Sequence, residues 1–135
     1  MSSNSKVWAK IAVKAEDDYS SLEENERVIY SLRKVIDAVN DKGLMSLYTD
    51  LDDYYAEDSI DDLYTAGLDE IAAVLESANA IFPGGCPPED FYDRSEIIES
   101  WDGEYDEFFA QLTEDILMFS IDMESCYDKL ISEME

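Results

Sequence analysis

The stretch SLEENERVIYSLRKVIDAVN, from Ser21 to Asn40, carries the clearest secondary-structure signal in the chain. Its apolar residues recur three or four positions apart, which is the spacing of one face of an α-helix. They are Leu22, Val28, Ile29, Leu32, Val35, Ile36 and Val39. Ser21 to Glu24 fits a capping box, in which a Ser and an acidic side chain bond exposed backbone N–H groups. The pattern predicts a helix that begins after Ser21 and ends near Gly43.

The same helical spacing continues on both sides of this stretch. Before it, Val7, Trp8, Ile11 and Ala15 share one side of a short segment, with Lys6, Lys10 and Lys14 on the other. After it, apolar stripes run from Ile60 to Phe82, around 95–101, from Tyr105 to Phe119 and from Met123 to Met134. Ser59 is a plausible cap for the first of these stripes, Gly67 marks a close packing point or a break, and PGGCPP (Pro83 to Pro88) ends it.

Strand-type alternation is nowhere convincing, so we predict an all-α fold of five to seven helices. A length of 135 residues suits one compact domain with its own core, covering residues 1–135. Residues 1–20 could form an N-terminal helical arm of that domain. Hydrophobic residues make up 46% of the chain and aromatic residues 12%, which is too much for a disordered acidic chain.

The charge of the chain is its most unusual property. It has 34 acidic and 9 basic residues and no histidine, for a net charge of −25. Residues 1–42 contain 8 acidic and 7 basic residues, whereas residues 43–135 contain 26 acidic and 2 basic residues. Such a field repels nucleic acid and anionic membranes and attracts basic proteins, at a cost in stability from self-repulsion.

The sequence predicts a soluble, cytoplasmic protein that does not enter a membrane. Lysines interrupt the apolar residues near the N-terminus, and no segment approaches the roughly 20 apolar residues of a membrane span. Two cysteines, Cys86 and Cys126, are too few for a disulfide framework.

The segment DLDDYYAEDSIDD, from Asp50 to Asp62, contains seven acidic residues and no base. A calcium loop that begins at Asp50 would need a glycine at its sixth position, where the chain has Tyr55, so we do not expect a calcium site. On a helix, Asp58, Asp61 and Asp62 would share a face and should point to solvent together.

These acidic residues and two later groups are our candidates for partner binding. The second group, Asp69 and Glu70, stands opposite the apolar residues of the Ile60–Phe82 stripe and is expected to face solvent. The third lies at the expected start of a helix, where the helix dipole alone would favour carboxylates. The full set is Asp50, Asp52, Asp53, Glu57, Asp58, Asp61, Asp62, Asp69, Glu70, Asp102, Glu104, Asp106 and Glu107.

Catalytic chemistry finds little support in the sequence, and we expect no enzyme activity, metal or cofactor. The absence of histidine excludes Ser–His and Cys–His nucleophiles. A magnesium-dependent, all-α nucleotide pyrophosphohydrolase would need converging carboxylates, for which Glu23-x-x-Glu26 and Asp50-x-x-Asp53 are the candidates. However, such spacings arise by chance in so acidic a chain, and no basic cluster is evident to hold a triphosphate. Arg94 is expected to form a structural ion pair, and Cys86 to be structural.

Rows of carboxylates on rigid helices can approximate the phosphates of duplex DNA, which a DNA-binding protein contacts through Lys and Arg. We therefore predict a DNA mimic that occupies the DNA-contacting surface of a basic DNA-binding protein and blocks its DNA binding. The alternative is an immunity-type inhibitor of a basic nuclease toxin. Halophilic adaptation is disfavoured, since it would make residues 1–42 equally acidic.

Several motifs carry a resemblance to a known family. The segment AGLDEIAAVLESANAIFPGGCPPED (66–90), followed by Arg94, resembles a widespread all-α bacterial domain whose best-known member is a dimeric DNA-mimic protein. ERVIY (26–30), NDKGL (40–44) and the segment Trp101 to Phe109 are similar to further parts of that family. This sequence departs from the family pattern in having Lys42 before Gly43 and in Ser46. The resemblance implies an all-α fold, a homodimer, and binding to a transcription regulator or nucleoid protein.

Overall fold

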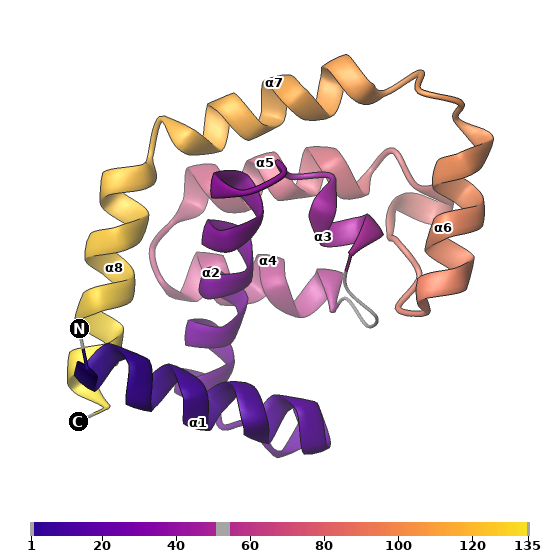
Figure 1. The fold of residues 1–135 in the computed structure, drawn as a ribbon. Helices are drawn as coiled ribbons and strands as arrows, with labels where there is room; N and C mark the ends of the chain where they lie inside the picture. Colours follow the sequence, from indigo (N-terminus) through magenta and orange to yellow (C-terminus); the bar gives the residue numbers. More distant parts are fainter. Residues whose placement is uncertain (1, 51–54, 135) are drawn as a thin grey trace.

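The computed structural model describes residues 2–50 and 55–134 of the chain, with side chains from residue 6 onward (Figure 1). The described part contains eight α-helices, two short 3-10 helices and no strand, so the all-α prediction is confirmed. The helices are α1 (Ser2–Asp18), α2 (Glu24–Asn40), α3 (Ser46–Thr49), α4 (Ala56–Thr65), α5 (Asp69–Asn79), α6 (Phe91–Ser100), α7 (Asp106–Leu117) and α8 (Ser120–Glu133). The helix count exceeds five to seven because α3 is a single turn and the Ile60–Phe82 stripe forms two helices.

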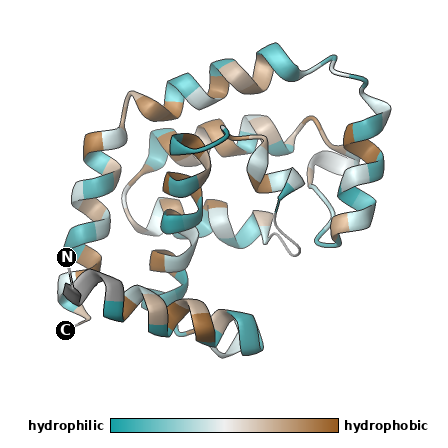
Figure 2. Cartoon of the chain, in the orientation of Figure 1, coloured by the Kyte–Doolittle hydropathy of each residue, from teal (hydrophilic) through white to brown (hydrophobic). Residues whose placement is uncertain are grey.

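Helix α2 is the central element, and it packs against α1, α3, α4, α7 and α8. Its residues Ile29, Leu32 and Val35 are fully buried. Hydrophilic and hydrophobic segments alternate along the helices (Figure 2), as expected where each helix turns one face to a common core. The apolar stripe predicted from the sequence is thus the stripe around which the other helices are arranged.

The capping box at the start of α2 lies two residues later than predicted. The capping box is formed by Glu23 and Glu26, and the Glu23 N–H donates to Oε1 of Glu26 at 2.9 Å. Ser21 belongs instead to a 3-10 helix, Tyr19–Ser21, and its hydroxyl donates to the Asp18 carbonyl at 2.7 Å. Glu23 and Glu26 have the three-residue spacing that a capping box needs, and the turn at Asp18 engages Ser21 elsewhere.

Gly67 interrupts the helix, which is one of the two roles predicted for it. It adopts φ of +82° between α4 and α5, a conformation that an L side chain rarely adopts. Ser59 is not a cap, because α4 begins at Ala56 and Ser59 is buried inside the helix. Helix α5 ends at Asn79, shortly before PGGCPP, and that run forms a 3-10 turn at Pro83–Gly85 instead of continuing the helix.

The end of the fold that contains α3, α5, α6 and α7 is packed with aromatic rings. Tyr48, Phe82 and Phe109 are buried. The ring centroid of Tyr48 lies 5.1 Å from that of Phe82 and 5.7 Å from that of Phe109. Trp101, which follows α6, packs its ring 5.0 Å from that of Phe82. These contacts bring α6 and the start of α7 onto the core.

Helix α1 packs against α2 and α8, and its N-terminal end meets the C-terminal end of α8, so the two termini lie close together (Figure 1). Ile11 is only 1% exposed, and Trp8 stacks on Tyr30 of α2 with 5.9 Å between ring centroids. The N-terminal segment is therefore attached to the core by apolar contacts. None of the helices in the described residues is long and apolar enough to cross a membrane.

Candidate functional site

Most of the predicted partner-binding carboxylates lie on the surface. Those that are exposed are Asp50, Glu57, Asp61, Asp69, Glu70, Asp102, Glu104, Asp106 and Glu107. Asp58 is partly buried, and Asp62 is fully buried. Asp52 and Asp53 lie outside the described residues. We refer to Glu57, Asp58 and Asp61 as the α4 group, to Asp69 and Glu70 as the α5 group, and to Asp102, Glu104, Asp106 and Glu107 as the α7 group.

Asp62 does not point to solvent, and that part of the prediction is wrong. Its side chain is 0% exposed and lies 2.9 Å from Nη2 of Arg27 in an ion pair. The Ser31 hydroxyl donates to its Oδ2 at 2.7 Å. This carboxylate also raises the pKa of Arg27 through their hydrogen bond. Asp62 therefore joins α4 to α2, and it has no surface with which to contact a partner.

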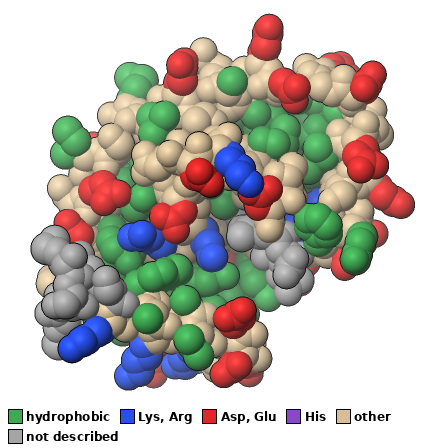
Figure 3. All heavy atoms as spheres, in the orientation of Figure 1, with side chains coloured by type: hydrophobic (Ala, Val, Ile, Leu, Met, Phe, Trp, Pro, Cys, Tyr) green, Lys and Arg blue, Asp and Glu red, His purple; other side chains and the backbone are tan. Residues whose placement is uncertain are grey.

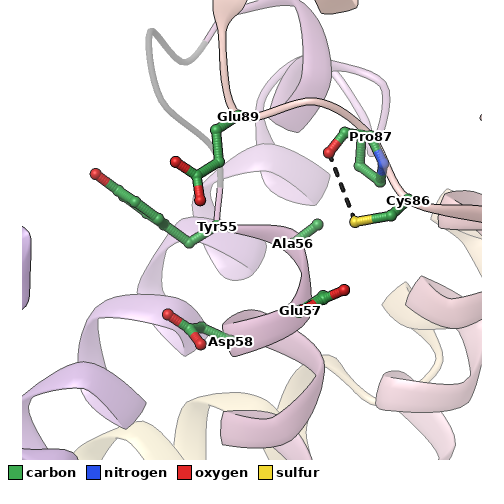
Figure 4. A pocket seen from close by; sticks show the side chains of 7 residues that line it. All are labelled: Tyr55, Ala56, Glu57, Asp58, Cys86, Pro87 and Glu89. Carbon is green, nitrogen blue, oxygen red and sulfur yellow. Dashed lines mark hydrogen bonds between the residues drawn. The ribbon is translucent and has the colours of Figure 1, made fainter.

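Two members of the α4 group, Glu57 and Asp58, border a hollow of about 250 Å³ between α4 and the segment that follows α5 (Figure 4). Glu89 joins Glu57 and Asp58 there, a grouping that sequence spacing does not predict because Glu89 lies about 30 residues after the other two. The Glu57, Asp58 and Glu89 carboxylates point in different directions around Tyr55 and Cys86 (Figure 4). The hollow is thus an acidic surface whose carboxylates do not converge on one point.

Tyrosines fix one side of this hollow. The Tyr19 hydroxyl donates to Oδ2 of Asp58 at 3.1 Å, and the Tyr19 ring stacks on Tyr55 with 3.6 Å between centroids. Burial, followed by the Asp58 charge, raises the pKa of Tyr19 well above its ordinary value. Tyr19 therefore stays a neutral hydrogen-bond donor that holds the Asp58 carboxylate in place.

Cys86 lies in the same hollow and has the surroundings of an unreactive thiol. Its Sγ lies 3.6 Å from the Pro87 carbonyl oxygen, to which the thiol donates. Burial raises the pKa of the Cys86 thiol, and the Glu57 carboxylate raises it further. A protonated thiol is a poor nucleophile, so these contacts favour the structural role expected from the sequence.

The α5 group borders a second hollow, of about 380 Å³, between the start of α5 and the start of α8. Asp122, in the first turn of α8, adds a third carboxylate to Asp69 and Glu70. The floor is apolar, with Leu68 and Phe119 partly buried and Ile71 buried. Asp122 is not among the residues predicted from the sequence, although its place in the first turn of an expected helix, where acidic residues are favoured, could have indicated it.

The α7 group occupies the connection between α6 and α7. Asp102 and Gly103 both have positive φ, +49° and +79°, and they form the tight turn before α7. Asp106 and Glu107 lie in the first turn of α7, where the helix dipole stabilises their charge. The α6–α7 connection and the α7–α8 corner lie at opposite ends of α7 in Figure 1. Twelve residues of helix separate them, or about 18 Å.

Many of the protein's bases are bound within the protein itself. Within the described residues, four of the nine form ion pairs: Lys14–Glu26, Arg27–Asp62, Arg33–Asp37 and Lys42–Asp50. Lys34 lies over the rings of Trp8 and Tyr30, 5.9 and 5.2 Å from their centroids. On the face drawn in Figure 3, basic side chains gather near α1 and α2, and acidic side chains extend along α6, α7 and α8.

Arg94 is fully buried, and it crosslinks three parts of the chain. Its Nε donates to the Tyr48 carbonyl at 3.0 Å, and its Nη1 donates to the carbonyls of Pro88 (3.1 Å) and Glu89. These bonds tie α6 to α3 and to the loop before α6, in accord with a structural role. The sequence of residues 43–135 has only one other base, Lys129, which is exposed. The acidic surface of this segment therefore has very little basic relief.

Glu23 and Glu26, two of the carboxylates suggested for a magnesium enzyme, stabilise the start of α2. Glu26 takes part in the capping box with Glu23 and accepts from Lys14 Nζ at 2.7 Å. The pKa of Glu26 is lowered, first by its bond to the Glu23 N–H and then by Lys14. Asp53 of the other pair lies outside the described residues. Within residues 2–50 and 55–134, no group of three or more Cys, Asp or Glu side chains is arranged to hold a metal ion.

Comparison with known proteins identifies the family. Neither curated proteins nor solved structures gave a match. The family of DMP19-like proteins matches residues 20–133, which cover α2 to α8 and leave out α1. This is a family of DNA mimics, in agreement with the resemblance seen in the sequence. The match covers most of the chain, and the protein therefore belongs to the DMP19-like family.

Proposed function

We propose that this protein is a DNA mimic that binds the basic DNA-contacting surface of a transcription regulator or nucleoid protein and blocks its DNA binding. The observation that carries the proposal is the uncompensated acidity of residues 43–135. They contain 26 acidic residues, and of their two bases Arg94 is fully buried. A surface of this kind attracts basic proteins by the field that also attracts them to DNA.

The mechanism requires carboxylates that stay in place, as phosphates do in a duplex. The α5 group and part of the α7 group are on helices that pack on the core through Ile71, Leu75, Phe109 and Ile116. A carboxylate on an ordered helix loses less side-chain and backbone freedom on binding than one on a disordered tail. The α4, α5 and α7 groups, with Glu89 and Asp122, are therefore our candidates for contact with the Lys and Arg residues of the partner.

The internal ion pairs contribute indirectly to this function. Arg27 bonds the buried Asp62, and Lys42 forms an exposed ion pair with Asp50 at 3.1 Å, so carboxylates of the protein itself balance both positive charges. The protein accordingly presents few cations that would repel the partner's basic surface. We further infer that it acts in the cytoplasm, without catalysis, metal or cofactor.

Affinity capture followed by DNA competition tests the proposal. The protein should retain basic DNA-binding proteins from its native cytoplasm at low salt, and added duplex DNA should release them. Binding should weaken as salt rises, because exposed charges are screened. If capture succeeds and DNA does not compete, mimicry is wrong and an immunity-type inhibitor becomes the better explanation.

A matched pair of variants separates the acidic surface from net charge. Asp69→Asn/Glu70→Gln neutralises two exposed carboxylates of the α5 group. Glu16→Gln/Asp17→Asn neutralises two exposed carboxylates on α1, outside the family match. We expect the first pair to weaken binding by about tenfold and the second by much less, since each contact of this type is worth about 0.5–1 kcal/mol. Equal effects would show that only net charge matters.

A further inference from the structure

Two large apolar side chains are exposed at the corner between α7 and α8. Met118 is 80% exposed and Ile121 is 81% exposed, more than any other large apolar residue of the described chain. They lie three positions apart: Met118 directly follows the last residue of α7, Leu117, and Ile121 lies in the first turn of α8. Hydrophobic side chains protrude from this corner in Figure 3. Because exposed apolar surface gains nothing from folding, this corner calls for an explanation outside the core.

The corner adjoins the hollow at the start of α5. Phe119, between Met118 and Ile121 in the sequence, lines that hollow together with Leu68 and Ile71. Met118 and Ile121 do not line the hollow themselves, but they flank Phe119 in the sequence and so place exposed apolar side chains next to its floor. Asp69, Glu70 and Asp122 form the rim of the same hollow. The surface combines an apolar centre with acidic edges, as protein-binding surfaces often combine an apolar core with a polar rim.

The charges around the corner select its occupant. The sequence contains no Lys or Arg between Arg94 and Lys129, or between Lys42 and Arg94. A second copy of this chain docked by its own corner would bring two sets of carboxylates together without a base between them. A basic segment would instead place its cations against Asp69, Glu70 and Asp122. Apolar contact and charge complementarity together describe an amphipathic helix with Lys or Arg on its edges.

We propose that Met118 and Ile121 dock the apolar face of a basic amphipathic helix of the partner protein, with Asp69, Glu70 and Asp122 contacting its cations. The inference rests on the proposed function, because the helix belongs to the protein that the DNA mimic inhibits. It goes further in that a phosphate backbone offers no counterpart to this apolar contact. The contact would let the protein discriminate among basic partners that DNA-like charge alone cannot distinguish.

Two synthetic helical peptides of equal length and equal Lys content test this proposal. One carries Leu along one face, and the other has Gln at those positions, which is also a good helix former. Binding of both is measured to wild type, to Met118→Ser/Ile121→Ser and to the control Val13→Ser, in which a 59% exposed apolar residue of α1 is removed. Circular dichroism confirms that the three proteins are equally helical.

Wild type and Val13→Ser should prefer the Leu peptide by about 10- to 100-fold, given the apolar area that two side chains can bury. The preference should persist in high salt, where charge contacts are screened. Met118→Ser/Ile121→Ser should lose it while still binding the Gln peptide at low salt. An unchanged preference in that variant would overturn the proposal. So would sedimentation showing a wild-type dimer that the double substitution dissociates, because the occupant would then be a second copy.

The outcome is separable from that of the proposed function. If the double substitution leaves the peptide preference intact but DNA still displaces captured basic proteins, the docking proposal fails and DNA mimicry stands. If DNA displaces nothing and the peptide preference is present and lost on substitution, the corner binds a basic helix in a protein that is not a DNA mimic.

Discussion

The buried carboxylate of Asp62 should be worth more to stability than any exposed carboxylate of the protein. The perturbation is Asp62→Ala, which removes the partner of both Arg27 and Ser31. Asp61→Ala is the matched control, because Asp61 is adjacent, exposed and of the same charge. Both substitutions relieve the self-repulsion of the chain by one unit, so the difference between them isolates the buried contacts.

The magnitude follows from burial. Removing one member of a buried ion pair costs roughly 3–5 kcal/mol when the remaining charge cannot reach water. The Arg27 side chain is 33% exposed and can be hydrated, so that part of the cost is smaller. Ser31 is 3% exposed, and an unpaired buried hydroxyl costs about 1–3 kcal/mol. Together we expect Asp62→Ala to lower the free energy of unfolding by about 2–4 kcal/mol, and Asp61→Ala to change it by less than about 0.5 kcal/mol.

Urea unfolding followed by circular dichroism measures this difference directly. A thermal scan should show a drop in Tm of roughly 8–16 °C for Asp62→Ala, at about 4 °C per kcal/mol for a domain of this size. A double-mutant cycle with Ser31→Ala should give a coupling of about 0.5–3 kcal/mol. The reasoning is refuted if Asp62→Ala and Asp61→Ala are equally stable. Partial unfolding would also weaken binding, so a loss of partner binding in Asp62→Ala is not evidence of contact.

Three further predictions test the fold. The lowered pKa of Glu26 means that its carboxylate stabilises the protein above the ordinary Glu pKa of about 4.3, and that this contribution is lost as pH falls through the lowered value. The difference in unfolding free energy between wild type and Glu26→Gln, measured by urea unfolding, should therefore be full above about pH 5 and close below about pH 4. A difference that does not depend on pH would contradict the assignment. Gly67→Ala should lower the free energy of unfolding by about 1 kcal/mol, because Gly67 has φ of +82°; crowding adds nothing, since an added Cβ meets no atom within 4 Å. Gly67→Asn should lower it by less, and a larger loss for Asn than for Ala would point to crowding instead. Arg94→Lys should lower the free energy of unfolding by about 2–4 kcal/mol, since a lysine ammonium cannot reproduce the guanidinium bonds to the carbonyls of Tyr48, Pro88 and Glu89. Thermal unfolding measures the loss, and Lys129→Arg, which should unfold near the wild-type temperature, is the control.

The helices were predictable because the apolar spacing repeats over long stretches. The stripe of α2 stands out in the sequence, and Ile29, Leu32 and Val35 are indeed its most buried residues. A single turn such as α3, Ser46–Thr49, is too short to show any period. Whether Gly67 interrupts a helix also depends on tertiary packing. The choice between a continuous helix and the observed break was therefore open until the structure was known.

Asp62 shows how the surface was misjudged. The apolar spacing predicts that Ile60 lies on the core-facing side of α4, which would turn Asp62 outward. In the structure Ile60 is only partly buried, and Ala56, Ser59 and Leu63 form the buried face. Small residues such as Ala56 and Ser59 contribute little to an apolar pattern, so the predicted buried face of α4 is rotated by about one position from the observed one. Arg27 and Ser31, four residues apart on α2, were the available clue that a polar partner was needed there.

Glu89 and Asp122 show a second limit. Each is brought to a predicted acidic group by tertiary contacts between helices or loops that are distant in the sequence. Periodicity within one helix says which residues share a face, but not which other element lies beside that face. The acidic groups could thus be predicted from the sequence, whereas their final membership required the fold.

The separation of charge along the chain acquires a physical meaning in the folded state. Residues 1–42 supply seven of the nine bases, and two of these, Arg27 and Lys42, pair with acids of the later segment, Asp62 and Asp50. In the folded state Arg27 holds α4 against α2, whereas residues 43–135 keep a large excess of carboxylates over bases. The apolar core around α2 must offset the resulting self-repulsion, which is a cost with no structural benefit. A protein that tolerates this cost while keeping Met118 and Ile121 exposed is better explained by a basic, partly apolar partner than by solubility alone, because solubility would favour polar residues at that corner.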